Sequence, residues 1–287
     1  MVVYNIITYG RFGNNVQQLV NCISIALKTG VTTVNFDFDG FHKNTIHLGQ
    51  ESQVHEGSCP RRIVSYFYYR NQLKTVYKKY EPSPYYERKD ICMKYILPIL
   101  KFRNPDRYKP YYDSALFIHI RSGDIFRGGG GHPGYIQPPL EFYIKIFNRE
   151  KRRKFVFYED DVNPVVNKLK SLFPNVTFAS VSLHELIGVF INASYVVCGK
   201  GTLIPQILLF NNKLKFCYST QNCGPLTIYA HVPNYIDVWA NTEEQKRLMI
   251  KYRGTILNIP EWGRVHKKIL PPKVQCDNNF TNKFIMI

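Results

Sequence analysis

The feature that most constrains the fold is an alternation of strand-like and helix-like segments between residues 114 and 210. The strand-like segments are short apolar or β-branched runs that end in turn-forming residues, and the segments between them carry apolar residues at helical spacing. Strands are expected at 114–120, 154–158, 175–179, 194–198 and 215–218, and helices at 140–147, 162–172, 182–191 and 203–210. A chain that returns through a helix after each strand builds a parallel sheet with helices on its faces, so the sequence predicts a doubly wound α/β fold.

The N-terminal part of the chain begins with the same strand, turn and helix pattern. An apolar run at 2–7 leads through a glycine turn into an amphipathic segment at 15–28, Gly30 is placed to end that helix, and 31–38 resumes as a strand. Prolines and tyrosines then interrupt the pattern, although 88–101 has helical spacing. We therefore expect a second strand-and-helix lobe at this end of the chain.

These patterns divide the chain into three parts, and its length of 287 residues allows two lobes. Residues 1–113 are expected to form an N-terminal lobe and residues 114–240 a C-terminal lobe. The remaining segment, 241–287, begins with a helical pattern and is expected to pack across both lobes.

The chain carries an excess of positive charge, with 38 Lys and Arg residues against 21 Asp and Glu residues and a formal net charge of +17 at pH 7. Such a field attracts anions, which include nucleic acid, an anionic membrane surface or a phosphorylated substrate, and charge alone does not choose among them. Much of the excess lies in runs such as 74–79 and 149–154 that are typical of a solvated surface. The apolar run at the N-terminus is too short for a signal peptide and no uncharged apolar stretch is long enough to span a bilayer, so a soluble protein, cytoplasmic or otherwise unanchored, is expected.

The seven cysteines include no CxxC pair, and their odd number indicates neither a zinc ribbon nor a closed disulfide framework. Reduced and mostly packed thiols are expected. No cluster of His and Cys has metal-ligand spacing, and no DxD sequence stands in a context that argues for a bound metal, so no metal requirement is expected.

Three motifs with chemical content follow expected strands, where parallel sheets bind their ligands. The first is the turn from Gly10 to Asn14, at which glycines permit close backbone approach and free helix N–H groups favour negative charge. Taken alone, the turn is better explained as a purely structural glycine turn. The turn lacks the GxGxxG pattern, so binding of NAD or FAD gains no support.

The second motif, from His119 to Asp124, places an imidazole and a guanidinium two residues apart at the end of a strand. Alternation along a strand turns His119 and Arg121 to the same face. An arginine in this position can fork onto a diphosphate with two charge-assisted hydrogen bonds. Asp124 either orients Arg121 or caps the following segment, and His119 taken alone also has a structural reading.

The third motif, from Gly199 to Thr202, opens an expected helix and offers a second candidate phosphate cradle. It lacks the spacing of a P-loop, and the alternative is a glycine-rich helix start capped by Thr202. A fourth set, the acidic run from Glu159 to Asp161, closes the strand at 154–158. Its carboxylates either bind ribose hydroxyls or base donors, or cap the next helix.

Taken in their order along the chain, the motifs resemble those of the α1,2-fucosyltransferase and protein O-fucosyltransferase superfamily, inverting enzymes that use GDP-fucose. The turn at 10–14 is similar to the GR(L/F)GN turn of that family, and the run at 119–124 is similar to its HxRxGD motif. The order continues with similar segments at 139–143, 155–161 and 183–209. The resemblance covers the first turn and most of residues 115–210.

The resemblance implies a GT-B-like α/β fold of two Rossmann-like lobes, with the acceptor on the N-terminal side and the nucleotide sugar in the C-terminal lobe. It implies that Arg121 stabilises the leaving diphosphate, with Asp124 as the second catalytic candidate. The donor-binding candidates from the motifs are Arg11, Phe12, Gly13, Asn14, His119, Arg121, Asp160, Lys200, Gly201 and Thr202. The sequence departs from the family where a Ser-Trp-Trp cluster is replaced by the turn ending at Thr202, and in the glycine-rich loop at 128–135.

The expected activity is an inverting, metal-independent transfer of fucose from GDP-fucose to a glycan hydroxyl, with the donor as co-substrate and no other cofactor. The general base stays open among Asp37, Asp39 and Asp124. One alternative keeps the mechanism and changes the donor to a xylosyl or galactosyl nucleotide. Others are a basic module that binds nucleic acid, disfavoured because no RNA- or DNA-binding motif is present, and a glycan-binding protein without catalysis. The expected partners are thus a nucleotide sugar and a glycan acceptor, without nucleic acid.

Overall fold

The computed structural model describes residues 3–6, 10–49, 85–121, 140–159, 163–198, 201–219 and 235–237. Contacts between Cα atoms divide the chain into two compact units, Met1–Phe102 and Arg103–Ile287, which we call the N-terminal unit and the C-terminal unit. This division falls before the boundary expected after residue 113. The segment 241–287 and its expected helix lie outside the described residues.

The C-terminal unit is built on a six-stranded sheet in which all neighbouring strands are parallel. Its strands are β4 (Leu116–Ile120), β5 (Lys154–Tyr158), β6 (Thr177–Ala179), β7 (Tyr195–Val197), β8 (Phe216–Ser219) and β9 (Tyr235–Asp237). Their order across the sheet is β6-β5-β4-β7-β8-β9. Counted from β4, this is the order 3-2-1-4-5-6 of dinucleotide-binding Rossmann sheets. The predicted α/β class with a parallel sheet is confirmed.

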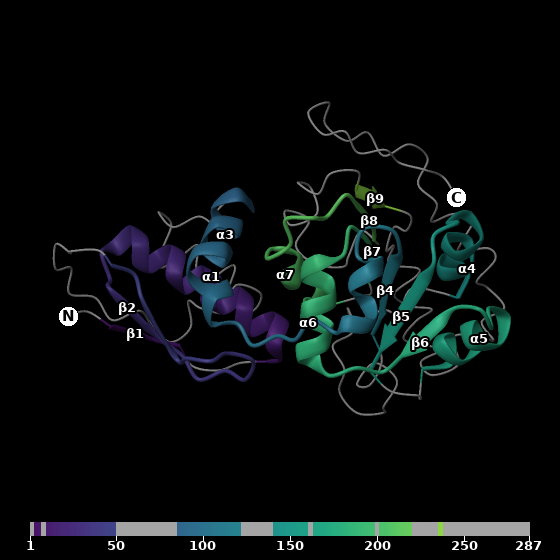
Figure 1. Ribbon diagram of the computed structural model, residues 1–287. Coiled ribbons are helices and arrows are strands. Elements are labelled where there is room, and N and C mark those ends of the chain that lie inside the picture. Colours follow the sequence, from purple (N-terminus) through teal and green to yellow (C-terminus); the bar gives the residue numbers. More distant parts are fainter. Residues whose placement is uncertain are drawn as a thin grey trace, which may run out of the picture. The chain divides into compact units, whose positions relative to one another are not determined.

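Helices lie on both faces of this sheet (Figure 1). They are α4 (Leu140–Arg149), α5 (Pro164–Leu172), α6 (Leu183–Asn192) and α7 (Leu203–Leu208). On one face, Ile118 of β4 shares a buried cluster with Tyr143 of α4 and Leu169 of α5. On the other face, the ring of Phe157 meets Phe190 of α6 edge-on, with their centroids 5.9 Å apart. Because side chains alternate along the strands, they pack into two separate apolar layers, one on each face of the sheet.

Two of these helices begin at caps that the sequence provides. The Ser182 hydroxyl accepts a hydrogen bond from the Glu185 N–H at 3.3 Å, and the Glu185 carboxylate accepts one from the Ser182 N–H, which makes a capping box for α6. The Asn163 side chain accepts from the Val165 N–H at 2.9 Å at the start of α5. Pro164 occupies the first helical position, where its missing N–H costs nothing.

A 3-10 helix, η3 (Asp106–Tyr111), precedes β4 and packs on the sheet through a tyrosine. The ring of Tyr108 meets Phe117, Phe155 and Phe157 edge-on, with centroid distances of 6.4, 5.2 and 5.3 Å. These contacts explain why the stretch before β4 belongs to the C-terminal unit.

The described part of the N-terminal unit contains a three-stranded sheet of β1 (Val3–Asn5), β2 (Thr33–Asn35) and β3 (Thr45–His47). β1 and β2 are parallel and are joined by helix α1 (Phe12–Thr29), whereas β3 pairs antiparallel with β2. Gly30 ends α1 in the left-handed region at φ 70°, and its N–H donates to the carbonyl of Ala26. The predicted strand, helix, glycine cap and strand are confirmed, and β3 is an addition.

The single helix predicted at 88–101 is instead three short segments, α3 (Tyr85–Ile91), a π-helical turn η1 (Cys92–Ile96) and a 3-10 turn η2 (Leu97–Ile99). Buried Arg88 ties α3 to α1 by donating from Nη1 to Oδ1 of Asn21 at 3.0 Å. Leu100 then forms an antiparallel bridge with Phe41.

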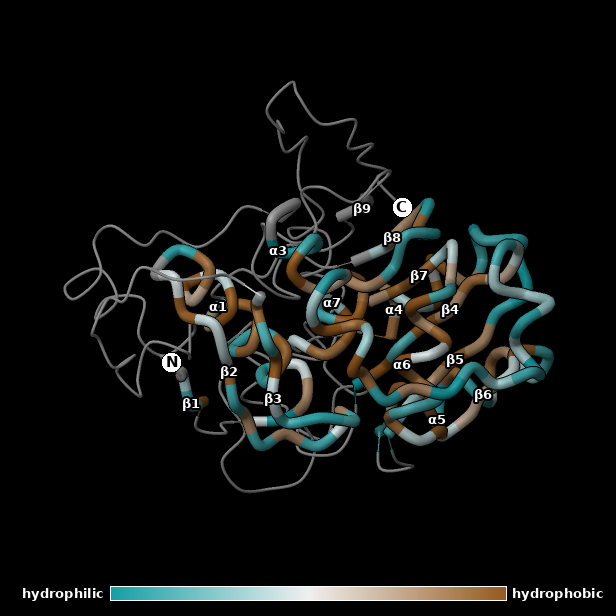
Figure 2. The backbone as a smooth tube through the Cα atoms, turned by 60° about the vertical axis from the view of Figure 1, so that its left-hand side comes forward, coloured by the Kyte–Doolittle hydropathy of each residue, from teal (hydrophilic) through white to brown (hydrophobic). Residues whose placement is uncertain are grey.

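Hydropathy follows this architecture. The tube in Figure 2 is brown along much of the central strands and the helices of the C-terminal unit, and teal in many of the peripheral turns. Among the described residues, no helix combines the length and the apolar character needed to cross a membrane.

Candidate functional site

The strand order creates a topological switch point between β4 and β7. From β4 the chain continues to β5 on one side, and from β7 it continues to β8 on the other. In open α/β sheets, ligands bind beyond the carboxyl ends of the strands at such a point, because the two connections diverge there. Arg121 directly follows β4, while Gly201 and Thr202 lie in the connection from β7 to α7. Two of the predicted motifs therefore share this edge of the sheet.

The Arg121 guanidinium lies against the backbone of Gly201. A Cβ atom placed on Gly201 would be 2.6 Å from Nη1 of Arg121 and 3.6 Å from its Cζ. Gly201 also has φ +122°, a conformation that L side chains rarely adopt. The positive φ of this position favours glycine, and an added side chain would displace the guanidinium.

The backbone at Arg121 is fixed by a residue that sequence analysis missed. Fully buried Asn163 donates from Nδ2 to the carbonyl of Arg121 at 2.9 Å while its Oδ1 caps α5. One side chain thereby links the end of β4 to the start of the helix after β5. The signal in the sequence was an asparagine directly before a proline, which is typical of a helix start.

His119, which precedes Arg121 by two residues in the motif, is buried within the sheet layer. Its side chain is 3% exposed and its ring meets Phe190 edge-on at 6.3 Å between centroids. Burial, with a smaller contribution from the Arg121 charge, lowers the pKa of His119 to about 3, so the imidazole is neutral at physiological pH. Its Nε2 has no hydrogen-bond partner within the described ranges. The donor contact expected of His119 stays a prediction, whereas its packing role is visible.

Gln206 is a further polar residue near this turn. It is fully buried in α7, and both Oε1 and Nε2 of its amide lack hydrogen-bond partners among the residues that the structure describes. Its main-chain N–H donates to the carbonyl of Thr202 at 3.1 Å, which places it one helical turn beyond the motif. The only sequence signal was one amide inside the apolar run 203–210.

The structure also bears on the reading of Thr202 as a simple helix cap. Thr202 occupies the N-cap position of α7, but its side chain makes no capping hydrogen bond. Asp124, Asp160 and Lys200 lie outside the described residues, so their predicted roles remain predictions.

The turn from Gly10 to Asn14 belongs to the N-terminal unit. Arg11 is exposed at the N-cap position of α1, Gly13 is buried, and Asn14 is half-buried beside Gly10, where an added Cβ would be 2.4 Å from the Asn14 Nδ2 atom. Phe12 is 6% exposed and stacks on Phe41 at 5.8 Å. Phe12 thus has a core role, and the donor contacts predicted for this turn remain predictions.

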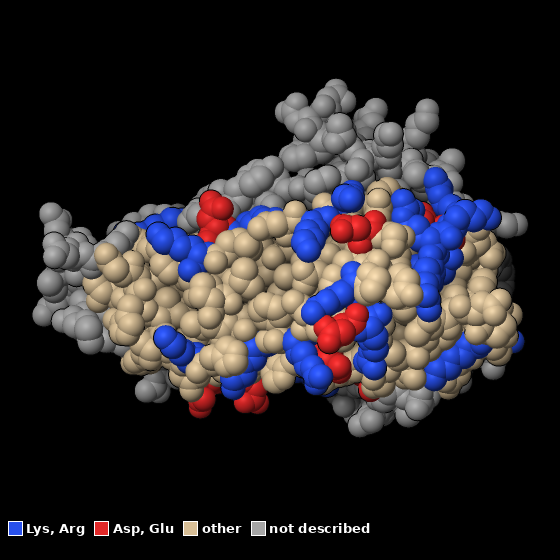
Figure 3. Space-filling view, viewed as in Figure 1, with Lys and Arg blue, Asp and Glu red and all other residues tan. Residues whose placement is uncertain are grey.

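Some of the basic residues lie at the amino ends of the strands of the C-terminal sheet, opposite the carboxyl ends. The Arg152 guanidinium stands 3.8 Å from the centroid of Tyr195, which begins β7, and that of Arg153 stands 4.5 Å from the Tyr111 ring. The run at 149–154 is exposed or half-buried, as expected of a solvated surface, and lies away from the carboxyl ends of the strands. Figure 3 shows one face of the molecule, on which Asp and Glu side chains lie among the Lys and Arg side chains.

In the part of the chain that the structure describes, no group of three His, Cys, Asp or Glu residues is arranged to hold a metal ion. No protein-family model matches the chain, and no curated protein is similar enough in sequence to be counted as a relative. Inference about function therefore rests on the geometry of the site and on its motifs.

Proposed function

We propose that the C-terminal unit binds the diphosphate of a nucleotide sugar and that Arg121 takes up negative charge on the departing nucleotide during glycosyl transfer. The observation that carries this proposal is the placement of the Arg121 guanidinium against Gly201 at the switch point between β4 and β7. A guanidinium keeps its charge at any working pH and presents paired donors that match a diphosphate. The sheet order supports a nucleotide ligand at the same place.

In the proposed reaction an acceptor hydroxyl attacks the anomeric carbon while the bond from that carbon to the diphosphate oxygen breaks. The electron pair of that bond leaves with the nucleoside diphosphate, the hydroxyl proton passes to a base or to water, and the configuration is inverted. Charge on the leaving group grows as the bond breaks, so Arg121 stabilises the transition state more than the bound donor. Lys200 and Thr202, from the neighbouring connection, are proposed to assist.

The donor that the motifs favour is GDP-fucose, and the acceptor is a glycan hydroxyl. In this proposal the N-terminal unit, which begins with a strand, helix and strand, is the acceptor-side lobe of a GT-B arrangement. No metal takes part, because Arg121 and helix N–H groups supply the positive charge that the leaving group requires.

The test compares turnover of GDP-fucose, with a panel of glycan acceptors, between the wild type and Arg121→Ala. We expect this change to cost about 2–4 kcal/mol of transition-state stabilisation. Arg121→Lys should recover only part of the activity, because an ammonium is a point charge without the paired donors of arginine. Lys151→Ala removes an exposed charge of the basic run and serves as the matched control.

Calorimetric titration with GDP, UDP, ADP and CDP separates the donor classes. GDP should bind the wild type most tightly and Arg121→Ala weakly. Preference for UDP would move the proposal to a xylosyl or galactosyl donor. Near wild-type turnover by folded Arg121→Ala would overturn the role of this arginine, and steeply salt-dependent binding of RNA without binding of any nucleoside diphosphate would overturn the proposed function.

A further inference from the structure

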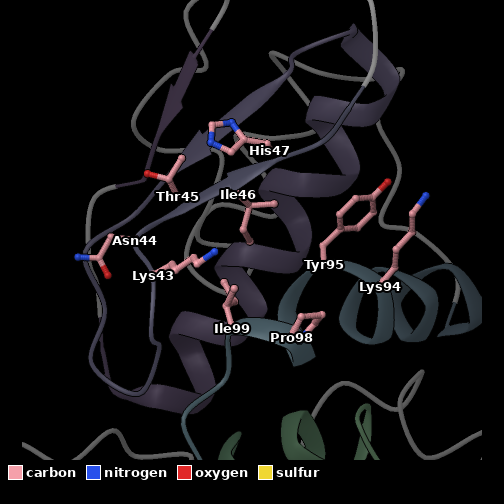
Figure 4. A pocket seen from close by; sticks show the side chains of 9 residues that line it. All are labelled: Lys43, Asn44, Thr45, Ile46, His47, Lys94, Tyr95, Pro98 and Ile99. Carbon is pink, nitrogen blue, oxygen red and sulfur yellow. The ribbon is translucent and has the colours of Figure 1, made fainter.

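A pocket of about 520 Å³ lies in the N-terminal unit, and nothing in the proposed transfer reaction uses it. Strand β3 and the two residues before it form one side, and the turns η1 and η2 form the other (Figure 4). The volume falls within the range of about 300–1,000 Å³ that small-molecule sites occupy.

Positive charge reaches the pocket from both sides. Lys43 comes from the segment before β3 and Lys94 from η1, and none of the nine lining residues is acidic. Within the described residues, neither ammonium has a carboxylate partner. The Lys94 Nζ atom lies instead 4.9 Å from the centroid of the Tyr95 ring. Both charges are therefore available to an anionic group of a ligand.

Apolar surface lies between the two lysines. Ile46 lines the β3 side of the pocket and Pro98 and Ile99 line the helical side, where Figure 4 also shows the Tyr95 ring. Ile46 and Ile99 are buried, whereas Tyr95 is half-buried and offers part of its ring to the pocket. A ligand thus meets an aromatic and aliphatic surface between two cations.

The β3 edge adds hydrogen-bonding groups. Asn44 and Leu48 bond toward β2, through the Asn44 carbonyl and the Leu48 N–H. Main-chain groups alternate in direction along an antiparallel strand, so those of Thr45 and His47 face away from β2, on the outer side of β3. Donors and acceptors at this edge suit a ligand with several hydroxyls.

The π-helical turn is an independent indication of function. Such turns have poorer hydrogen-bond geometry than an α-helix and are found frequently at functional sites. Here the turn brings two consecutive residues, Lys94 and Tyr95, to the pocket wall.

We infer that this pocket binds a sugar that carries a negative charge, namely a uronate, a hexose phosphate or a hexose sulfate. The charged group lies in the electrostatic field of Lys43 and Lys94, the hydroxyls engage the β3 edge, and the face of the sugar ring packs on Tyr95 and the aliphatic surface. A neutral sugar leaves both ammonium groups unused, and a bare inorganic anion leaves the apolar surface unused. The site exists whether or not the C-terminal unit transfers sugars.

The test titrates the full-length, isotope-labelled protein with glucuronate, glucose 6-phosphate, glucose 6-sulfate, glucose and inorganic phosphate, followed by amide chemical shifts. At least one charged sugar should bind with a Kd on the order of 1 mM. It should bind at least about tenfold more tightly than glucose or inorganic phosphate, and shift the amides of β3 and η1.

Matched variants locate the site. Lys43→Gln and Lys94→Gln should each lower the affinity for the charged sugar by about tenfold. Because both side chains are exposed, neither change threatens folding. Lys28→Gln removes one exposed charge of the same unit at the end of α1, outside the pocket, and should leave the affinity unchanged. The inference fails if glucose or phosphate binds as tightly as every charged sugar, if no charged sugar shifts the pocket amides, or if Lys28→Gln weakens binding as much as the pocket variants do.

Discussion

At the scale of single residues, Gly201 couples backbone geometry to the position of a charge. Its φ of +122° disfavours a side chain, and an added Cβ would come within 2.6 Å of Nη1 of Arg121. A Cβ there strains the turn, at a cost of about 1–3 kcal/mol, and pushes the guanidinium aside. The residue therefore acts on the proposed diphosphate site through Arg121.

We predict that Gly201→Ala lowers both the free energy of unfolding and the affinity for GDP, measured by urea unfolding and by calorimetry. The affinity should fall by about tenfold, because the paired contacts of the guanidinium are misaligned. Gly49→Ala is the matched control, since Gly49 has φ +68° with nothing within 4 Å of an added Cβ. It should lose stability and keep its affinity, and equal affinity loss in both variants would contradict the coupling.

His119 makes stability depend on pH in a known direction. Burial lowers its pKa to about 3, below the value of about 6.5 for an exposed histidine. Between these values the unfolded chain binds a proton that the folded chain rejects, so this contribution to stability is complete above pH 6.5 and declines as the pH falls toward 3.

We therefore predict that His119→Gln flattens the dependence of unfolding free energy on pH between about 6.5 and 3. Urea unfolding at a series of pH values measures the slope for both proteins. An unchanged slope in the variant would show that His119 does not carry this titration.

Sequence reasoning at this scale found Arg121 and Gly201 but not the residues that hold them. The arginine was visible because it follows His119 by two residues at the end of an apolar strand, within a recognisable motif. The bond from Asn163 to the carbonyl of Arg121 joins residues 42 positions apart, and no local pattern encodes such a contact. The burial of His119 against Phe190 likewise depends on where α6 docks.

At the scale of elements, the capping box at the start of α6 is the clearest local determinant. The reciprocal bonds between Ser182 and Glu185 satisfy main-chain N–H groups that the first helical turn leaves open. They fix the point at which the chain enters the helix that carries Phe190.

We predict that Ser182→Ala lowers the free energy of unfolding by about 1 kcal/mol, a typical cost for a lost N-cap. Ser171→Ala is the control, because the Ser171 hydroxyl is exposed and, among the residues that the structure describes, bonds only to the carbonyl of Lys168 within a helix. Chemical denaturation should show little change for the control, and similar losses in both variants would mean that the cap contributes nothing.

Most elements of the C-terminal unit were predictable because each apolar run is bounded by polar or turn-forming residues, as at Lys154–Tyr158. The prediction was wrong at 88–101, where apolar spacing does not distinguish an α-helix from a π-helical turn followed by a 3-10 turn. The three-residue strands Thr45–His47 and Tyr235–Asp237 were missed because they are too short to show alternation. They are strands only through their pairing with β2 and β8.

At the scale of the whole molecule, the sequence predicted a parallel sheet but not its strand order. Alternation of strands and helices requires parallel pairing, yet the side on which each new strand docks depends on tertiary packing. The observed order β6-β5-β4-β7-β8-β9 places the connections after β4 and β7 at one switch point. The candidate site was thus predictable as separate motifs and not as one location.

Four buried thiols, two in each unit, report whether the units are folded. Cys22 and Cys92 of the N-terminal unit and Cys198 and Cys217 of the C-terminal unit are buried thiols that form no disulfide within the described residues. Burial raises the pKa of the Cys92 thiol to about 12, which suppresses the reactive thiolate.

We predict that these cysteines resist iodoacetamide at pH 8 in the native protein and react in urea, as read by peptide mass spectrometry. Both units should lose protection over the urea range in which circular dichroism changes. Labelling of any of the four without denaturant would contradict the burial described for its unit.

All five residues of β4 are buried, and Arg121, which we propose to contact the diphosphate, is the next residue. In this proposal the residues that support the sheet and the loops that bind the ligand lie largely in different stretches of sequence. We expect that the loops that follow β4 and β7 can be exchanged for those of another protein with the same strand order without loss of the core. Grafting these two loops onto the existing sheet is then a route to a changed ligand preference.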